Sequence, residues 1–233
     1  MTESLPERLT IYPMSRRNHL AFSLAGVVLL LGGLLTMQFG WSLGGLLLFM
    51  PGFTLLLFGL FKQFEPKVSL EFTPSQLVWH LRHGQVAIDW SNIITLQSLS
   101  ITDHRGATDL HYLGLKVWDR KPIIDQLPPR AAKSLFHEYR SLLHVALKEA
   151  IQRQESAAQL QEDLDTWVSP CGTRYQGLKG IFAARLAQLK QYLGADLYIP
   201  ATSLDRHQDA FIQLFKQYQQ AVQQQQWENQ NSD

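Results

Sequence analysis

The chain has 233 residues, 45% of them hydrophobic, and a formal net charge of +1 at pH 7. This balance provides no broad basic field, which argues against a nucleic-acid partner held by general attraction to phosphates. A single cysteine excludes an internal disulfide and is typical of a protein in a reducing compartment.

A long uncharged tract comes first along the chain. Residues 18–61 contain no Asp, Glu, Lys or Arg, and the polar, turn-permissive Gln38-Phe39-Gly40 divides them into two apolar blocks. A helix of roughly 20 residues crosses a bilayer, so the tract is long enough for two spans. Backbone groups in lipid must bond internally, which requires both blocks to be helical. We therefore predict a transmembrane helical hairpin over residues 20–61.

The two spans are expected at about 20–37 and 41–61, with a kink at Pro51 in the second. Small residues let membrane helices approach closely. Seven glycines occur in the tract: Gly26, Gly32, Gly33, Gly44, Gly45, Gly52 and Gly59. We expect them to serve packing within the hairpin, with contact between copies as the alternative, for which Gly40 and Gly44 have small-xxx-small spacing.

Basic residues flank only the outer ends of this tract. Arg8, Arg16 and Arg17 precede it, Lys62 and Lys67 follow it, and the turn carries no charge. The positive-inside rule then predicts two cytoplasmic chain ends, with residues 1–19 as a cytoplasmic N-terminal segment. The arginine pair also resembles a twin-arginine export signal, but the residues after it depart from that motif and a second span follows, which favours an anchor.

The remaining residues, 62–233, are enough for one cytoplasmic domain with its own core. Their first part favours strands joined by the turns Thr73-Pro74-Ser75 and His83-Gly84, followed by an exposed loop at 103–107. Five strands are expected, at 67–72, 76–82, 85–90, 93–101 and 110–118. Because short turns connect them, the sheet should be antiparallel.

The pattern changes to helical spacing after Pro128-Pro129. Three amphipathic helices are expected, over about 130–154, 176–193 and 204–224. A short helix containing Leu160, Leu164 and Trp167 is expected after the first of them. A short strand is predicted at 196–200. The fold class is therefore α+β, attached to a membrane α-hairpin.

Two local motifs carry a family resemblance. Thr73–Leu77 has the pattern T-P-x-x-L, and Ile88–Ile93 has the pattern I-x-W-x-x-I. With the lead "IYPMSRRN", the hairpin and the tail "LYIPATSL", the chain resembles membrane-anchored bacterial proteins with a PH-like domain. The resemblance implies an antiparallel PH-like sheet, a C-terminal closing helix and a bacterial inner membrane, but no activity. The helical stretch from about 125 to 194 departs from the pattern and is interpreted as an insertion.

The histidines invite a metal or acid–base interpretation. They include His80, His83, His104, His111, His137, His144 and His207. Residues three apart on a strand point to opposite faces, which separates His80 from His83. His137 and His144 share a helical face, but their spacing of seven exceeds the three or four typical of ligand pairs. No cysteine pair or carboxylate cluster completes a coordination set. We predict no metal, cofactor or catalytic residue.

Cys171 offers the main alternative. It lies in a Gly-containing loop where Arg174 would lower the thiol pKa. A nucleophile also needs a base that the sequence does not place. The alternative is therefore a membrane-bound enzyme acting on a lipid or small molecule, through Cys171 or paired histidines. A non-enzymatic protein is favoured.

The leading interpretation is an integral inner-membrane protein whose cytoplasmic domain binds a protein or a lipid. A protein partner is expected to bind through the 125–194 insertion. Arg120, Lys121, Arg130 and Lys133 are candidate contacts to anionic lipid. They are sparser than the clusters that recognise headgroups, so a solvated loop is favoured and lipid contact is the alternative. The acidic stretch from Glu155 to Asp165 is expected to be a solvated helix face.

Overall fold

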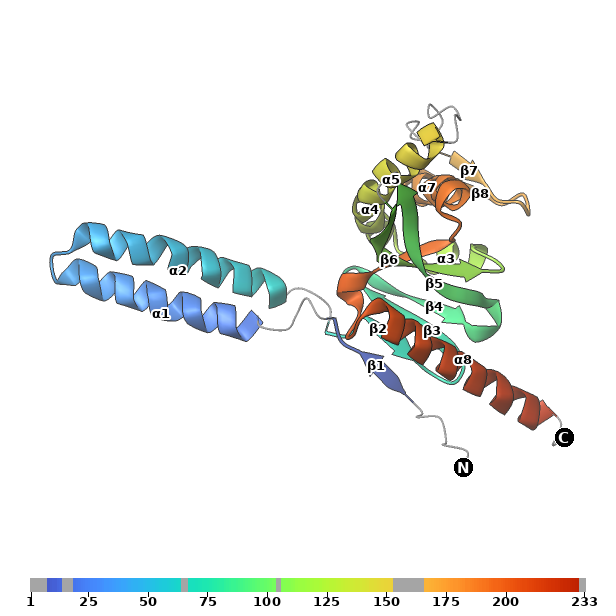
Figure 1. Cartoon of the computed structure of the whole chain (residues 1–233), viewed down its shortest axis with the longest axis horizontal. Helices are drawn as coiled ribbons and strands as arrows, with labels where there is room; N and C mark the ends of the chain where they lie inside the picture. The colour runs from blue at the N-terminus through green and yellow to red at the C-terminus, as the bar shows by residue number, and fades with distance from the viewer. Residues whose placement is uncertain (1–7, 14–18, 64–66, 104–105, 153–165, 231–233) are drawn as a thin grey trace. The chain divides into compact units, whose positions relative to one another are not determined.

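The computed structural model describes residues 8–13, 19–63, 67–103, 106–152 and 166–230. The chain forms two compact units (Figure 1). One is Tyr12–Lys67, and the other combines Met1–Ile11 with Val68–Asp233. The expected basic flank at Arg16 and Arg17 and the expected acidic face at 155–165 lie outside the described residues.

The first unit is a helical hairpin. Its helices are α1 (His19–Gln38) and α2 (Ser42–Gln63), and Gly40 in the turn between them has φ of 84°. Both are long and apolar enough to cross a membrane, yet only 11% and 17% of the two apolar windows is buried. A core helix of a soluble protein would bury most of its apolar surface, whereas these helices direct theirs outward. The helix α2 continues through Pro51.

Glycines form the contact between the two helices. Gly26 and Gly33 on α1 face α2, and a Cβ added at either would lie under 3.0 Å from the backbone of the opposite helix. The matching residues on α2 are Gly45, Gly52 and Gly59. The backbones therefore touch directly, as small residues permit in membrane helices. In contrast, a Cβ at Gly32 would meet open space. Five of the seven expected glycines thus serve packing within the hairpin.

The second unit begins with a four-stranded antiparallel sheet in the order β1-β2-β3-β4. Its strands are β1 (Leu9–Ile11), β2 (Leu70–Phe72), β3 (Gln76–Leu81) and β4 (Gly84–Asp89). The pair β1–β2 joins residues from opposite sides of the hairpin, with Leu9 opposite Phe72 and Ile11 opposite Leu70. The segments before and after the hairpin therefore belong to one sheet (Figure 1).

A second antiparallel sheet follows, in the order β5-β6-β9. Its strands are β5 (Ile93–Asp103), β6 (Gly106–Val117) and β9 (Leu197–Pro200), and the 3-10 turn η2 (Trp90–Asn92) leads into β5. The prediction of antiparallel strands is confirmed, but the five expected strands are divided between two sheets instead of forming one. The strand β6 also starts four residues before the expected 110 because it continues the hairpin with β5. The chain then passes through η3 (Ala201–Ser203) to the last helix, α8 (Gln208–Gln230).

An aromatic cluster joins α8 to the first sheet. The ring of Phe72 has edge contacts with Phe211 and Phe215 of α8, at centroid distances of 6.0 and 5.8 Å, and Trp90 lies 5.4 Å from Phe215. The indole nitrogen of Trp90 donates a hydrogen bond to the carbonyl of Thr73 at 2.7 Å. The two motifs of the family resemblance thus meet in the core, and their role is to hold the β2–β3 turn against the closing helix.

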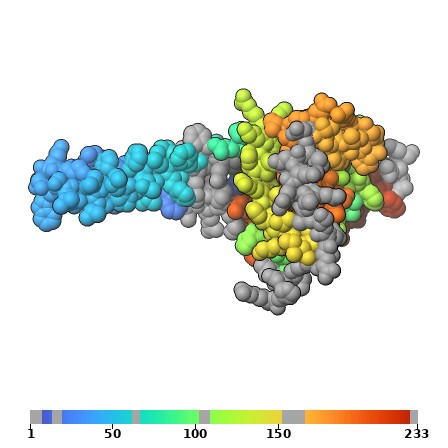
Figure 2. All heavy atoms as spheres, turned by 90° about the horizontal axis from the view of Figure 1, so that it is seen from above, coloured from blue at the N-terminus to red at the C-terminus, as the bar shows by residue number. Residues whose placement is uncertain are grey.

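Six elements are described between β6 and β9, on either side of residues 153–165. They are α3 (Lys121–Gln126), α4 (Pro129–Glu138), α5 (Arg140–Gln152), β7 (Thr166–Val168), β8 (Arg174–Gln176) and α7 (Gly177–Leu193). In Figure 2 the yellow-green and yellow atoms of α4 and α5 lie near the orange atoms of the β7–α7 region. Core residues of α4, α5 and α7 belong to the same buried cluster as those of both sheets.

The expectation of one long helix over 130–154 is wrong. The chain breaks at Tyr139, with φ of −75° and ψ of 1°, and forms α4 and α5 instead. Tyr139 is fully buried, and its hydroxyl donates to the Tyr198 carbonyl at 2.7 Å and accepts from the Tyr198 amide at 3.3 Å. A tertiary hydrogen bond to β9 therefore accompanies the break, and periodicity alone cannot reveal such a bond.

The prediction of a short helix that contains Trp167 is also wrong for the part of it that the structure describes. Trp167 lies in β7, which pairs antiparallel with β8, and its ring stacks on Tyr175 at a centroid distance of 5.9 Å. Leu160 and Leu164 lie outside the described residues. The local apolar spacing did not distinguish a helix from a strand because the strand has only three residues.

Candidate functional site

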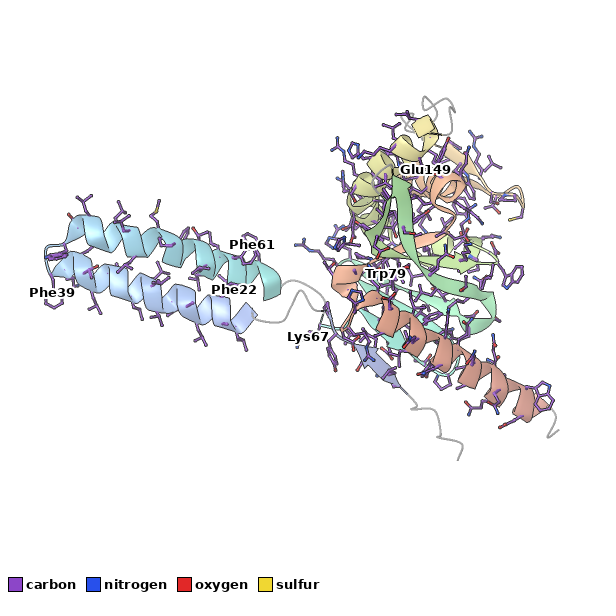
Figure 3. The ribbon with its side chains drawn as sticks, viewed as in Figure 1. Phe22, Phe39, Phe61, Lys67, Trp79 and Glu149 are labelled. Carbon is purple, nitrogen blue, oxygen red and sulfur yellow. The ribbon has the colours of Figure 1, made fainter. Side chains whose placement is uncertain are left out.

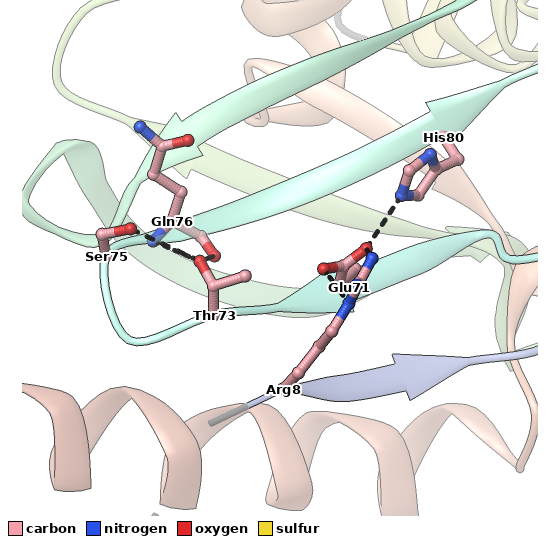
Figure 4. A network of polar contacts seen from close by, with 6 residues as sticks. All are labelled: Arg8, Glu71, Thr73, Ser75, Gln76 and His80. Atoms are coloured by element: carbon pink, nitrogen blue, oxygen red, sulfur yellow. Dashed lines mark hydrogen bonds and ion pairs between the residues drawn. The ribbon is translucent and has the colours of Figure 1, made fainter. Parts of the chain in front are cut away.

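The strand β1 is fixed to the domain by a charged cluster (Figure 4). The carboxylate of Glu71, on β2, forms an ion pair with the Arg8 guanidinium, and Arg8 Nη2 donates to Oε2 at 2.8 Å. The His80 ring nitrogen Nε2 lies 3.3 Å from the same oxygen. Glu71 is buried, and the hydrogen bond from Arg8 lowers its pKa. The cluster therefore joins the segment before the hairpin to the strand after it.

The buried Ser69 provides a second set of contacts that hold β1 in place. Its hydroxyl donates to the Ile11 carbonyl at 3.0 Å and also contacts the carbonyl of Ser203. Ile11 itself is fully buried in the domain core. Hydrogen bonds, a charge pair and apolar burial thus all hold β1 against β2.

Among the described residues, the structure does not gather the candidate histidines into a metal site. His80 contacts Glu71, and His83 lies in the turn between β3 and β4 rather than within a strand. His137 belongs to α4 and His144 to α5, so the break at Tyr139 separates them. Across the described residues, no group of three or more His, Cys, Asp or Glu side chains could hold a metal ion. His104 lies outside those residues.

A charged pocket of about 480 Å³ lies on the second unit. This pocket is formed by the β6–α3 junction, the β7–β8 turn, the end of α7 and the start of β9. Its lining contains Trp118, Asp119, Arg120, Lys121, Trp167, Ser169, Pro170, Cys171, Lys190 and Asp196. We call this the Arg120 pocket. It concentrates three basic side chains in a chain whose net charge is only +1.

Asp196 organises the floor of the Arg120 pocket. Its carboxylate is 2% exposed, and Oδ1 forms ion pairs with Lys190 Nζ at 2.7 Å and with Arg120 Nε at 3.4 Å. Its other oxygen, Oδ2, accepts a hydrogen bond from the Val117 amide at 3.2 Å. One buried carboxylate therefore holds two cations beside each other, as a buried charge requires partners.

Arg120 is the most enclosed of the three cations. Its guanidinium carbon lies 5.4 Å from the centre of the Trp167 ring, a cation–π contact. Its Nη1 nitrogen is shielded from solvent and has no hydrogen-bond partner among the described residues. An unsatisfied buried donor costs about 1–3 kcal/mol, and more when it is charged. Asp196 Oδ1 likewise lacks a hydrogen bond among the described residues, although Arg120 and Lys190 lie within ion-pair distance of it, so this buried ion pair is incompletely hydrogen-bonded on both sides.

Cys171 lies at the same pocket, in an exposed turn. Its sulfur is 3.1 Å from the Ser169 hydroxyl, and this hydrogen bond lowers the thiol pKa. None of the side chains that line the pocket is a histidine. The described lining of this pocket therefore offers the thiol no imidazole, the base that usually activates a nucleophilic cysteine.

The candidate lipid-contact residues fall into two places. Arg120 and Lys121 line the Arg120 pocket, whereas Arg130 and Lys133 are exposed on α4 and are not part of its lining. Sequence reasoning missed the partners Lys190 and Asp196. No local signal could have identified them, because the pocket collects residues spaced along the chain from 118 to 196.

A second hollow, of about 550 Å³, runs beside the edge strand β5. Of the described residues that line it, only Lys216 is charged; polar lining groups include Thr95, Gln97 and Ser98. An edge strand has unpaired backbone groups on one side. This hollow has less distinctive chemistry than the Arg120 pocket.

The comparisons with known proteins place the domain in a family. A family model described as "Protein of unknown function (DUF2982)" matches residues 70–221, more than half of the chain. The match starts at β2 and ends within α8, so it contains both candidate hollows but not α1 or α2. Among curated proteins and among solved structures, none matches this chain.

Proposed function

The chain belongs to the family of proteins of unknown function DUF2982, and from that premise we propose that it is a membrane-anchored binding protein. In this proposal the hairpin α1–α2 crosses a bacterial inner membrane twice. The rest of the chain forms a PH-like domain on the cytoplasmic side that binds a protein or an anionic lipid.

One observation carries the proposal: the pairing of β1 with β2. These strands are the nearest described sheet elements on either side of the hairpin, and three residue pairs and the Arg8–Glu71 ion pair join them. If the hairpin enters a bilayer, both of its ends must return to the domain on the same face. A two-span anchor satisfies this condition, and a single span does not.

The surface of the hairpin supports insertion. Its outward side chains are almost all apolar, and such a surface is costly in water. Phe39 and Trp41 are exposed at the turn, and Phe22 and Phe61 lie toward the other end (Figure 3). Aromatic residues at both ends of an apolar segment are typical of membrane interfaces.

The distribution of basic residues supports a cytoplasmic location for both ends of the hairpin. The basic residues flank the ends of the hairpin that connect to the domain, and the turn has none. The free thiol of Cys171, exposed at the surface of the domain, suits a reducing compartment.

Architecture supports the PH-like assignment. The resemblance implies an antiparallel sheet and a C-terminal closing helix, and the support for it is the presence of antiparallel sheets of four and three strands together with the helix α8. The segment at about 125–194 is then the insertion, and it offers a surface for a protein partner. Apolar side chains are exposed on it at Ile151, Val168 and Leu178.

Binding is favoured over catalysis because the thiol has Ser169 as its side-chain partner in the described structure, rather than a base. An enzyme that uses Cys171 remains the competing hypothesis. Replacing Cys171 with Ser separates the two, because an enzyme would lose its nucleophile and a binding protein would keep its partners.

Membrane extraction followed by photocrosslinking tests the proposal. We expect the full-length chain to stay in the membrane pellet after alkaline carbonate washing. A photocrosslinking residue at Val168 or Leu178 should capture a discrete protein partner, whereas the same residue at Trp227, exposed on α8, serves as the matched control. Release by carbonate would contradict the anchor. Absence of any adduct from the first two positions would contradict a protein partner there.

A further inference from the structure

We propose that the Arg120 pocket binds the phosphate group of an anionic ligand, through Lys121 and Lys190 at its mouth and with Arg120 behind them. The pocket volume of about 480 Å³ lies within the range of roughly 300–1,000 Å³ typical of small-molecule sites. This inference deepens the proposed function by naming the ligand class of the domain.

The charge balance of the lining favours an anion. The lining contains three basic side chains and two carboxylates. Asp196 is buried and shares its single charge between Arg120 and Lys190. The other carboxylate, Asp119, lies at the exposed rim, and its Oδ1 accepts the Lys121 amide at 2.8 Å. A positive charge therefore remains at the mouth, where Lys190 is 46% exposed and Lys121 is exposed.

The positions of these cations are set by the fold. Lys190 is held by Asp196, and the Arg120 guanidinium lies over Trp167. The loop that carries Asp119 is fixed by two hydrogen bonds with the Asn92 side chain, each 2.8 Å long. A site with its charges already in place loses little freedom when a ligand binds.

A phosphate matches this arrangement better than a carboxylate. It has more acceptor oxygens and a larger charge, and lysine ammonium groups bind it as point charges. The exposed Trp118, 76% accessible, adds an apolar wall at the mouth for the body of the ligand. The phosphate could belong to a lipid headgroup or to a soluble compound, and the same contacts would serve both.

The single cysteine provides a reporter for this pocket. Cys171 is the only thiol in the chain and is exposed at the lining, so its rate of modification measures access to the pocket. The experiment uses the full-length chain in nanodiscs of zwitterionic phosphatidylcholine. The rates of modification by a sulfonate-bearing and a trimethylammonium-bearing methanethiosulfonate are compared with those of a free thiol.

We expect the anionic reagent to be favoured several-fold over the cationic one, relative to the free thiol. Millimolar inorganic phosphate or glycerol phosphate should slow modification by at least about three-fold if the ligand is soluble. If the source is a headgroup, the slowing should appear only when phosphatidylglycerol is added to the nanodiscs. The measurement with phosphatidylglycerol rests on the proposed membrane anchor. The measurement with inorganic phosphate or glycerol phosphate does not, because it can be made equally on the full-length chain in a mild detergent, so failure of the anchor leaves it valid.

Charge-matched variants show which lysines produce the reagent preference and the protection by phosphate. Lys121→Gln with Lys190→Gln should abolish both the reagent preference and the protection, whereas Arg130→Gln with Lys133→Gln removes the same charge from α4 and should leave both unchanged. Lys121→Gln alone, at an exposed position, covers the case in which loss of the Lys190–Asp196 ion pair unfolds the domain. The proposal is overturned if neither phosphate nor anionic lipid protects the wild-type thiol, or if both double variants behave alike.

Discussion

Glu71 is a buried carboxylate with two partners, Arg8 on the far side of the hairpin and His80 on the neighbouring strand β3. The hydrogen bond from Arg8 lowers its pKa below the ordinary 4.5, against the opposing effect of burial. A carboxyl group with a lowered pKa in the folded state adds stability above its ordinary pKa, and this stability disappears as the pH falls through the lower, folded-state value. The attachment of β1 is therefore expected to weaken in acid.

Glu71→Gln tests this attachment. The substitution keeps the shape but removes the charge, so the free energy of unfolding at pH 7 should fall by about 1 kcal/mol, a modest value because Arg8 is 66% exposed. The fall in stability between pH 5 and pH 3 should also be smaller in the variant. Denaturant unfolding across this pH range measures both effects. An identical pH dependence in variant and wild type would contradict the role of Glu71.

Tyr139 joins the helical segment to the second sheet by two hydrogen bonds to one residue of β9. Its burial raises its pKa well above the ordinary value, so the hydroxyl stays protonated and can donate. In Tyr139→Phe the carbonyl and amide of Tyr198 lose these bonds. The expected loss of stability is about 1–3 kcal/mol, measured by denaturant unfolding.

Tyr112→Phe is the control for that prediction. Its hydroxyl also bonds to the helical segment, with the Glu138 carbonyl at 3.3 Å and the Ser141 hydroxyl at 3.2 Å, but these bonds are exposed to water. Its loss should cost about 0.5 kcal/mol or less. Equal effects of the two substitutions would contradict a special role for the buried bond.

At the scale of elements, the glycine contact sets the separation of α1 and α2. A Cβ at Gly26 would lie 2.6 Å from the backbone nitrogen of Leu56, which cannot move aside without shifting the helix. Gly26→Ala should therefore force the helices apart and destabilise the hairpin by about 1–3 kcal/mol.

Gly32→Ala supplies the comparison, because the added methyl group would meet open space. It should be neutral or slightly stabilising, since alanine has the higher helix propensity. Thermal stability of the full-length chain in a mild detergent distinguishes the two variants. Similar melting temperatures for both would show that the glycines do not form the contact.

The sequence was most informative for elements whose pattern is local. An uncharged tract predicted two apolar helices, and alternation of apolar residues predicted strands, because each pattern follows directly from the geometry of its element. The break at Tyr139 and the strand at Trp167 were missed. Both depend on partners elsewhere, Tyr198 and Tyr175, whose contacts have no signature in the local spacing.

The candidate site was less accessible to prediction than the fold. Arg120 and Lys121 were identified because they are neighbours in a short basic cluster. The carboxylate that holds Arg120 comes from residue 196, and the aromatic wall beneath it from residue 167. Only folding brings these three segments together, so the sequence suggested a surface patch and not a pocket.

At the scale of the whole molecule, one core unites parts of the chain that the hairpin separates. Ile11 precedes the hairpin, Phe72 follows it, and Tyr139 and Phe215 come from the helical segment and the closing helix; all four are buried in one cluster. The helical segment is therefore an integral part of the domain. Its deletion would expose this core, and point substitutions on its surface are the better way to map a partner.

The pairing of strands from both sides of the hairpin also constrains how the chain can cross a membrane. Because Leu9–Ile11 pairs with Leu70–Phe72, a membrane cannot lie between the two ends of the hairpin without breaking the sheet. We propose that α1 and α2 form a two-span anchor whose ends share one face of the membrane.

A topology map tests this claim most directly. Reporters that are active on only one side of the membrane are fused at the N-terminus, inserted at the turn around Gly40, and fused at the C-terminus. Both termini should report the cytoplasm and the turn the opposite side. Termini on opposite sides, or a turn on the same side as both termini, would contradict the account.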